Sequence, residues 1–335
     1  MPVARHALPT APAAPATTRV AVARQSPEAL GWALGCLGVA IFALSIPMTR
    51  LAGGSLAAPQ LPAEFVAIGR AALAGLLALA WLAATRAPRP RPAQWRALGG
   101  SALGVVFGWP LCLGWAVQRV DAVHAAVVTG LLPIATAALG AALTGQRPGR
   151  HFWAVALLGM ALVLGFAAWK GGAALQPADG LLAAAVAWGG FGYVMGARLS
   201  TTQVDGGPPM APEQVISWVL VASLPLTLPL AAWHWPAAPA AVAPAAWGGF
   251  LYLSVFSMWP GFFAWYRCLA LGGMLRVSQV QLLQPFLSMV LAVPLLGESL
   301  DAGTVAFALA VMVTVFLSKR SAAPAGRASP PEESP

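Results

Sequence analysis

The stretch WPLCLGW at residues 109–115 decides the fold, because it returns as WPGFFAW at residues 259–265. Trp, Pro and Trp fall in register without a gap. A shift of 152 residues then lays LLPIATAALGAALTGQ, residues 131–146, on LQPFLSMVLAVPLLGE, residues 283–298, with a proline at the same place in each. Leu and Gly matches are common in this composition, but matched Trp-Pro pairs and prolines are not. We therefore interpret the second half of the chain as a repeat of the first.

The composition around these motifs requires a membrane. The 335 residues are 59% hydrophobic and 9% charged, whereas soluble domains carry about 25% charged residues. The 30 prolines and 35 glycines would indicate low complexity in water, but membrane helices tolerate both. The three cysteines all fall inside apolar stretches, so they predict neither a disulfide framework nor a metal cluster. We expect no cofactor.

Apolar runs of about 20 residues, the length that crosses a bilayer, alternate with short loops. We expect an all-α polytopic membrane protein with ten transmembrane helices arranged as two inverted five-helix repeats. The first repeat is expected at 29–170 and the second at 171–320, between disordered, Pro-rich cytoplasmic tails at 1–28 and 321–335. The expected spans are 30–49, 63–85, 97–117, 122–143, 151–169, 180–198, 213–233, 245–267, 277–297 and 301–318.

Basic residues concentrate on one side of this arrangement. With the N-terminus inside, the inner segments carry 15 of the 19 Lys and Arg residues, the outer segments carry 3, and Arg70 is left within a span. Lys and Arg are retained on the cytoplasmic side of short loops, so both termini are expected in the cytoplasm. The net charge of +9 thus reports orientation, and nucleic-acid binding loses its support.

The parity of the repeat predicts a mechanism. Each unit has five expected spans, an odd number, so the second unit enters the membrane with the opposite orientation. Inverted repeats are typical of secondary transporters, whose substrate site lies near the midplane where the repeats meet. We expect that site between spans 1, 3, 4, 6, 8 and 9.

Three stretches carry a family resemblance. FALSIPMTRLAGG (42–54) ends the first span, VVTGLLPIATAALGAALTGQRP (127–148) closes the fourth, and VQLLQPFLSMVLAVPLLGESL (280–300) closes the ninth. Together they resemble the EamA family of the drug/metabolite transporter superfamily over residues 30–318. The resemblance implies a ten-helix carrier, in which the prolines of the fourth and ninth helices and the Gly-Glu ending recur. Pro133, Pro285, Gly297 and Glu298 match these features, while Gln146 departs from the usual Glu. The family is similar in sequence across amino-acid, sugar, nucleotide and drug exporters, so it leaves the substrate open.

Arg70 is the one charge expected well inside a span, about 10 Å from its start at 1.5 Å per residue. A cation in lipid costs about 2.5 kcal/mol or more, so its side chain should face the bundle interior or water. It either captures a carboxylate or phosphate of the substrate, or it snorkels or donates to carbonyls at a helix end. The aligned part of the seventh span is apolar, so Arg70 breaks the repeat symmetry, as a residue specific to the transported species would.

Two polar stripes follow the repeat. The ninth span carries Gln281, Gln284 and Ser288 on one face of a helix. At the same spacing in the fourth span lie Thr129, Leu132 and Thr136. The stripes are interpreted as walls of one substrate cavity, the alternative being hydrogen bonds between helices, worth about 0.6 kcal/mol each.

Prolines beside the stripes and in the Trp-Pro motifs are hinge candidates. Pro133 and Pro285 each free a backbone carbonyl one turn earlier, which either binds substrate or permits bending. Pro110 and Pro260 occupy the symmetric Trp-Pro positions. We expect all four to act as hinges.

Aromatic side chains complete the expected substrate site. Trp109 and Trp259 start the repeated motifs, and Trp188 and Tyr193 lie in the sixth span. Several other tryptophans near span ends are expected in interfacial belts.

Glycine repeats indicate where helices approach closely. They are Gly31 with Gly35, Gly100 with Gly104 and Gly108, and Gly192 with Gly196.

Acidic side chains are expected only at span ends or in loops, and His124 and His151 are expected at the interfaces. No carboxylate is therefore expected at mid-membrane to carry a coupling proton, as a membrane Glu does in the related small multidrug transporters. We expect facilitated transport or exchange rather than proton antiport. The acids are Glu64, Asp121, Asp179, Glu213, Glu298 and Asp301.

The functional prediction is a multi-pass carrier of the bacterial inner (plasma) membrane. It exports small metabolites, amino acids first, by alternating access between the inverted repeats, as a monomer or weak homodimer in the bilayer. A multidrug or organic-cation efflux carrier is the alternative. A membrane-embedded enzyme on lipid-type substrates would need paired carboxylates, a metal cluster or an activated nucleophile; none is expected at membrane depth, so we predict no catalytic or metal-binding residue.

Overall fold

The computed structural model describes residues 27–144, 149–170, 175–201, 203, 208–272, 281 and 283–321. These residues form helices, turns and loops, with an isolated bridge between Gly54 and Pro59. Residues 1–26 and 322–335, which hold nearly all of both expected tails, lie outside the described residues, as do residues 277–280 and 282 of the ninth expected span. The structure is that of an all-α polytopic membrane protein.

The helices of the first half fall on the expected apolar runs. Short 3-10 or π-helical segments precede or interrupt some of them. In chain order the elements are α1 (Pro27–Gly53), π-helical η1 (Phe65–Gly69) with α2 (Arg70–Ala84), η2 (Pro92–Gln94) with α3 (Trp95–Ser101), π-helical η3 (Ala102–Gly108), α4 (Trp109–Val117), α5 (Ala122–Thr129), α6 (Leu132–Thr144) and α7 (Arg150–Lys170).

The second half follows in the same way. Its described elements are α8 (Pro177–Thr201), α9 (Pro212–Trp233), η4 (Pro239–Ala241), α10 (Pro244–Tyr252), π-helical η5 (Leu253–Ser257), α11 (Pro260–Gly272), α13 (Gln284–Leu296) and α14 (Ala302–Ser321). Among the described residues, 7 helical stretches are long and apolar enough to cross a membrane, and two shorter apolar helices cover 284–296 and 302–314. The count of ten and the inverted relation of the halves stay predictions.

The fourth expected span differs from the prediction because it is broken. Helix α5 ends at Thr129, α6 begins at Leu132, and Gly130 and Leu131 join them. The physical reason is Pro133, which has no N–H to donate to the carbonyl of Thr129. Pro285 stands in the first turn of α13 in the same way. Both helix starts therefore lie at prolines that the sequence alignment pairs.

Both Trp-Pro motifs follow a π-helical segment. Segment η3 ends at Gly108, directly before Trp109 and Pro110, and η5 ends at Ser257, two residues before Trp259. A proline that lacks a donor and crowds the preceding turn favours such local widening. A third π-helical segment, η1, ends directly before Arg70.

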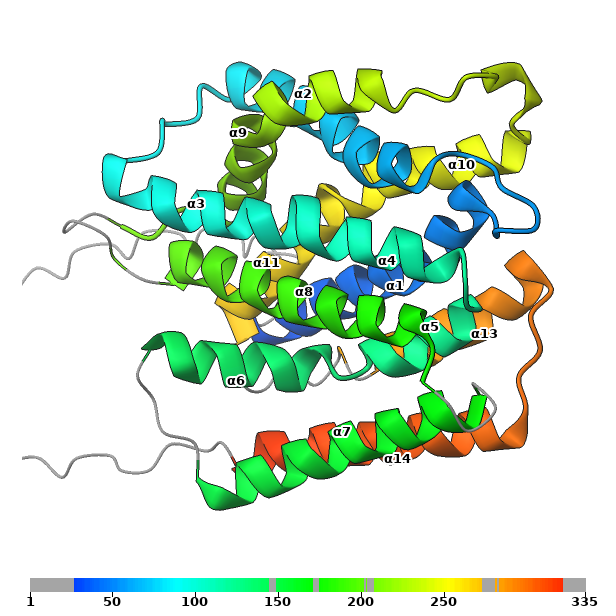
Figure 1. Cartoon of the computed structure of the whole chain (residues 1–335). Helices are drawn as coiled ribbons and strands as arrows, with labels where there is room; N and C mark the ends of the chain where they lie inside the picture. The colour runs from blue at the N-terminus through cyan, green and yellow to red at the C-terminus, as the bar shows by residue number, and fades with distance from the viewer. Residues whose placement is uncertain are drawn as a thin grey trace, which may run out of the picture.

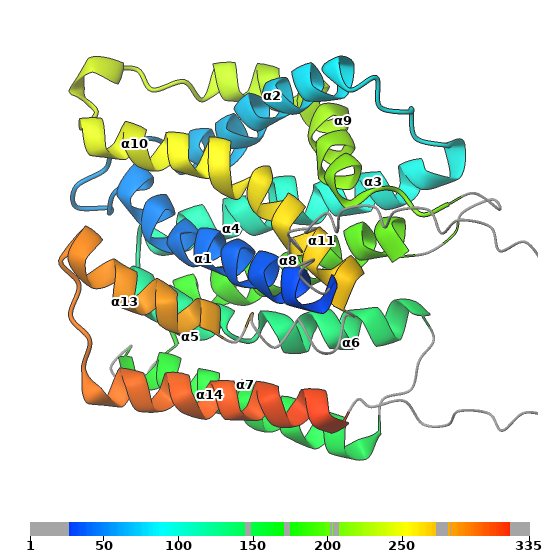
Figure 2. The same cartoon turned by 180° about the vertical axis from the view of Figure 1, so that it is seen from behind.

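The helices pack as a bundle with two distinct edges. Helices α7 and α14 lie side by side along one edge, and α2 packs against α9 at the opposite edge (Figure 1). Between them α1 contacts α11 and α13, and α8 contacts α4 and α6 (Figure 2). Two large apolar clusters fill the interior, one among α5, α7 and α14 and one between α1, α2, α9 and α11.

Candidate functional site

Arg70 is buried in the bundle, with 4% of its surface exposed. It is the first residue of α2, directly after the π-helical turn η1. No described carboxylate forms an ion pair with it, and its Nε has no hydrogen-bond partner. A buried charge is costly unless it is paired. The arrangement thus retains a cation that nothing described in the protein neutralises.

Arg70 opens onto a cavity of ≈ 40 Å³, here called the arginine cavity. Ile46 and Trp109 on its wall belong to one apolar cluster, and Phe42 and Val105 belong to the other, so the cavity lies where the two clusters meet. Helices of both halves contribute to it. Its lining is Phe42, Ser45, Ile46, Arg70, Val105, Trp109, Tyr193, Ser257, Met258, Phe262 and Gln284.

A second cavity of ≈ 20 Å³, here called the proline cavity, shares Ile46 and Gln284 with the first. It forms where the helix is interrupted between α5 and α6 and where α13 starts. Its lining is Ile46, Val127, Thr129, Gly130, Leu132, Pro133, Gln281, Gln284, Pro285, Phe286, Ala308, Val311 and Met312. The two cavities therefore lie next to each other around Gln284.

The polar stripe of the ninth expected span lies partly on these cavities. Gln281 and Gln284 line the proline cavity, and Gln284 Oε1 has no hydrogen-bond partner. Ser288 is fully buried with its Oγ unpartnered, but it lines neither cavity. In the fourth span Thr129 lines the proline cavity. Thr136 does not, and its Oγ1 donates to the carbonyl of Leu132 at 2.8 Å.

The aromatic candidates separate into two groups. Trp109 and Tyr193 line the arginine cavity. Trp188 is 41% exposed and lines neither cavity, because its side chain lies against Gly108 and Phe191. Trp259 donates from Nε1 to Ser217 Oγ at 2.9 Å and packs against Trp81 and Phe263, away from both cavities.

The four hinge candidates also separate. Pro133 and Pro285 line the proline cavity. Pro110 and Pro260 stand in the first turns of α4 and α11 and line neither cavity.

Two serines in the arginine cavity did not enter the sequence prediction. Ser45 on α1 and Ser257 at the end of η5 form a hydrogen bond between their Oγ atoms at 2.7 Å. Nearby, the Tyr252 hydroxyl donates to the carbonyl of Ile41 at 2.9 Å. These contacts join α1 to the second half beside Arg70. A serine in an apolar helix was the available signal, but its partner is 212 residues away.

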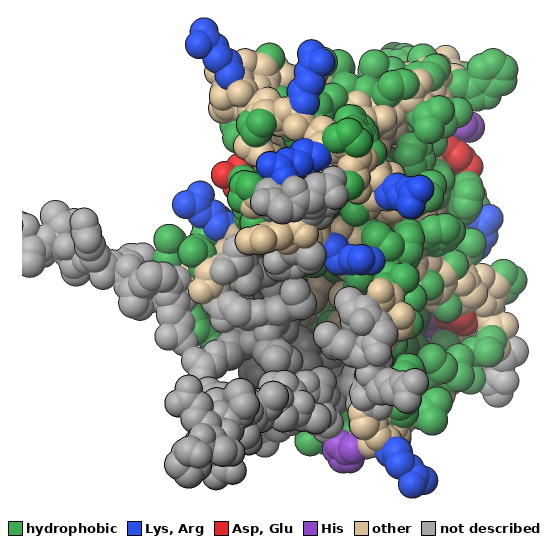
Figure 3. Space-filling view, turned by 90° about the vertical axis from the view of Figure 1, so that its left-hand side faces the viewer, with side chains coloured by type: hydrophobic (Ala, Val, Ile, Leu, Met, Phe, Trp, Pro, Cys, Tyr) green, Lys and Arg blue, Asp and Glu red, His purple; other side chains and the backbone are tan. Residues whose placement is uncertain are grey.

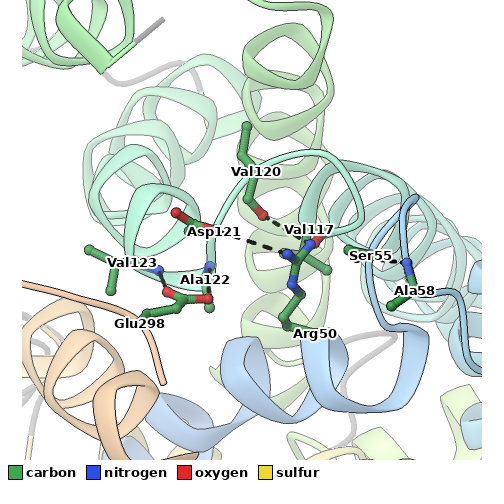
Figure 4. A network of polar contacts seen from close by, with 9 residues as sticks. All are labelled: Arg50, Ser55, Ala58, Val117, Val120, Asp121, Ala122, Val123 and Glu298. Atoms are coloured by element: carbon green, nitrogen blue, oxygen red, sulfur yellow. Dashed lines mark hydrogen bonds and ion pairs between the residues drawn. The ribbon is translucent and has the colours of Figure 1, made fainter. Parts of the chain in front are cut away.

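At one end of the bundle, charged side chains join loops of the two halves; we call this the Glu298 network (Figure 4). Glu298 accepts hydrogen bonds from the backbone N–H groups of Ala122 and Val123, each at 2.8 Å, and so caps the N-terminus of α5. Arg50 donates to the carbonyl of Val117 and lies 4.0 Å from Asp121. Burial raises the pKa of the Glu298 carboxyl, against the effect of the two N–H donors. An open cleft of ≈ 610 Å³ is lined by Arg50, Asp121, Glu298 and neighbouring residues.

Replacing Glu298 by Ala is expected to lower stability by about 1–2 kcal/mol, the usual cost of a lost helix cap. Thermal unfolding of the purified protein in detergent measures this. Glu213→Ala is the matched control, because Glu213 lies in the first turn of its own helix, α9, whose N-cap is Ala211. Equal melting temperatures for the two variants would contradict the capping role.

His124 packs into the bundle. The sequence predicts it near a membrane interface, and it stands in the first turn of α5. It is 6% exposed, and its Nε2 lies 2.7 Å from Oδ1 of Asp179. Asp179 is 8% exposed in the first turn of α8. Both positions are near span ends, as the sequence indicates, but inward packing buries them.

These helices, with a cationic cavity buried among them, define a multi-pass membrane protein with a polar internal site. The chain belongs to the EamA-like transporter family, which matches it twice, over residues 29–168 and 179–320. It is 40% identical over 292 residues to the uncharacterized transporter YdeK of Bacillus subtilis (strain 168), covering 87% of this chain and 98% of that protein. A solved crystal structure with 18% identity has a TM-score of 0.60, covering 88% of this chain and 99% of the other, which supports the fold. The protein is a membrane transporter, and family and relative point away from an enzyme.

Proposed function

We propose that the protein is an inner-membrane secondary transporter that exports small metabolites bearing a carboxylate, amino acids first. The carrying observation is Arg70, buried in a cavity between the halves with no described carboxylate beside it. A guanidinium binds a carboxylate through two parallel hydrogen bonds. Tyr193 and Gln284, which line the same cavity, supply further polar groups for the rest of such a substrate.

The proposed mechanism is alternating access between two inverted repeats of five helices each. The cavities of ≈ 40 and ≈ 20 Å³ are far smaller than ligand pockets of about 300–1,000 Å³, so substrate requires the surrounding helices to move apart. The interruption before Pro133 and the helix start at Pro285 both lie on the wall of the proline cavity. Broken helices at the substrate site are a recurring feature of inverted-repeat transporters.

We propose that both termini face the cytoplasm. Figure 3 looks at the end of the bundle opposite to the Glu298 network, and several Lys and Arg side chains lie on it. The α2–α3 loop supplies exposed Arg86 and Arg89 to the segments that the sequence assigns to the cytoplasm. Retention of basic residues on the cytoplasmic side supports this orientation. The proposed carrier acts as a monomer or weak homodimer.

Transport in proteoliposomes tests the proposal. Vesicles loaded with one unlabelled compound are given the same compound in radiolabelled form, and its exchange is measured for a panel of amino acids, their amides and organic cations. We expect exchange of amino acids and little exchange of the matched amides, which lack the carboxylate. Exchange of cationic dyes but of no carboxylate would favour the multidrug alternative and contradict the proposal.

A further inference from the structure

The buried contact between His124 and Asp179 is a second polar centre in the bundle. It joins the start of α5 to the start of α8, 55 residues apart. Asp179 Oδ2 also accepts a hydrogen bond from the backbone N–H of Gln176 at 2.8 Å. The ring of His124 lies 5.1 Å from that of Phe166, which is fully buried. Aromatic and aliphatic side chains thus keep water from a titratable pair.

The pair differs from the other ion contacts among the described residues. The side chains of Lys170 and Asp301 are 33% and 43% exposed, and Asp121 is 70% exposed opposite Arg50. Each side chain of the His124–Asp179 pair is 8% exposed. A charge in the pair is therefore poorly solvated, and an unpaired charge there is costly.

No other described charged group contacts the pair, because those on the helices around α5 and α8 have partners elsewhere or lie toward the other end of their helices. Arg50 of α1 contacts Val117 and Asp121, Glu298 caps α5, and Lys170 of α7 contacts Asp301. Arg119, after α4, donates to the carbonyl of Trp115. Described helices α6 and α13 carry no charged residue. The remaining titratable or charged residues in the sequence of these helices are Glu28, Cys36, Arg96, Cys112, Arg150, His151, Tyr193, Arg198, Glu213, Tyr266, Arg267, Cys268, Lys319 and Arg320.

Helix α5 connects the pair to the substrate site. It has 8 residues, from Ala122 to Thr129, so His124 and Thr129 lie roughly 7.5 Å apart along its axis. Val127, Thr129 and Gly130 at its far end line the proline cavity. A change in how α5 contacts α8 at His124 therefore reaches the cavity through one short helix.

We propose that His124 and Asp179 form a proton-binding site whose occupancy is linked to opening of the carrier. In the deprotonated pair, His124 is neutral, its Nε2–H donates to ionised Asp179, and the pair carries one negative charge. A proton from water adds to Nδ1 of His124, and the pair becomes an imidazolium–carboxylate contact without net charge. In the closed arrangement both side chains are shielded from water, and separation of α5 and α8 exposes them, so binding of the proton and opening of the carrier are linked.

The effect on transport rests on the proposed function, whereas the proton-binding site itself does not. Because linkage is reciprocal, a proton whose binding changes this contact makes transport depend on pH. The sequence interpretation expects facilitated transport or exchange rather than proton antiport, because it places no carboxylate at mid-membrane. Asp179 does lie at the start of α8, but it is buried there.

Nuclear magnetic resonance of the histidine rings tests the site without any substrate. The chain has 4 histidines, so protein labelled with ¹⁵N in His alone gives few ring signals, which His→Gln variants assign. We expect the chemical shift of the His124 ring nitrogens to change with pH and this change to differ between the wild type and Asp179→Asn, while the pH profiles of His151 and His234 are the same in both proteins. A His124 signal that does not change with pH, or whose profile is the same in Asp179→Asn, overturns the proposal.

Exchange in proteoliposomes tests the linkage. The wild-type rate is expected to change with pH by up to about tenfold per unit, the limit for one proton. His124→Gln, whose amide can still donate to Asp179, should fold and lose this dependence, and His151→Gln should keep it. A wild-type pH profile in His124→Gln overturns the proposal. If wild-type protein exchanges no compound at all, the transport proposal fails, and the resonance experiment still decides on the proton site.

Discussion

Replacing Arg70 by Leu is expected to abolish exchange of carboxylate substrates without lowering the stability of the protein. Removing one partner of a buried, hydrogen-bonded charge pair costs about 2–5 kcal/mol, which is roughly 30-fold to several thousand-fold in affinity. The fold should tolerate the change because Arg70 has no described carboxylate partner and its Nε makes no hydrogen bond. Removing an unpaired buried charge is neutral or stabilising, whereas breaking a buried pair is strongly destabilising.

Exchange rates and melting temperatures of the same preparations separate the two effects. Arg70→Lys keeps the charge but loses the planar fork, so it should retain part of the affinity. Arg89→Leu removes an equal charge from an exposed loop position and should leave the apparent KM unchanged. Unchanged KM in Arg70→Leu would contradict carboxylate capture. A large fall in its melting temperature would instead reveal a counter-ion that the described residues do not include.

The limits of the helices were predictable from sequence because long apolar runs and short loops follow directly from the bilayer. Helix α9, expected at 213–233, spans Pro212–Trp233, and α7, expected at 151–169, spans Arg150–Lys170. The interruption of the helix at Gly130 was not predicted, because the sequence is equally apolar on both sides of it. The effect of Pro133 is on backbone hydrogen bonding, which hydropathy does not measure. The three π-helical segments leave no hydropathy signal for the same reason.

The sequence identifies a candidate residue when its side chain is chemically unusual for its surroundings. It does not identify one whose role depends on which helix packs against it. A charge within an apolar span singled out Arg70, and the structure brings Trp109, Tyr193 and Gln284 to the same cavity. Helical spacing predicts Thr136 on one stripe with Thr129, but only Thr129 lines a cavity, because spacing does not say which helix covers each turn. His124 and Asp179 escaped because each lies near a span end, and their contact depends on how α5 packs against α8.

The close approach of two helices at Gly104 carries the second large expected effect. A Cβ added to Gly104 would lie 2.4 Å from Gly192 Cα and 2.5 Å from the carbonyl oxygen of Trp188. Both obstacles are backbone atoms of α8, so no side chain can rotate away. Gly104→Ala therefore has to push α8 away from η3. We expect a loss of stability of about 1–3 kcal/mol or more, as for other overpacked sites.

The same displacement should also abolish transport, because Tyr193 follows Gly192 on α8 and lines the arginine cavity. Melting temperature in detergent and exchange in proteoliposomes measure the two losses. Gly99→Ala in α3 is the matched control: an added Cβ there meets nothing within 4 Å, and replacing Gly by Ala in a helix gains up to about 1 kcal/mol. If Gly104→Ala melted at the same temperature as Gly99→Ala, the contact between η3 and α8 would be looser than the structure has it. The combination of a lower melting temperature and lost exchange in Gly104→Ala alone would show that packing at this contact holds Tyr193 against the cavity.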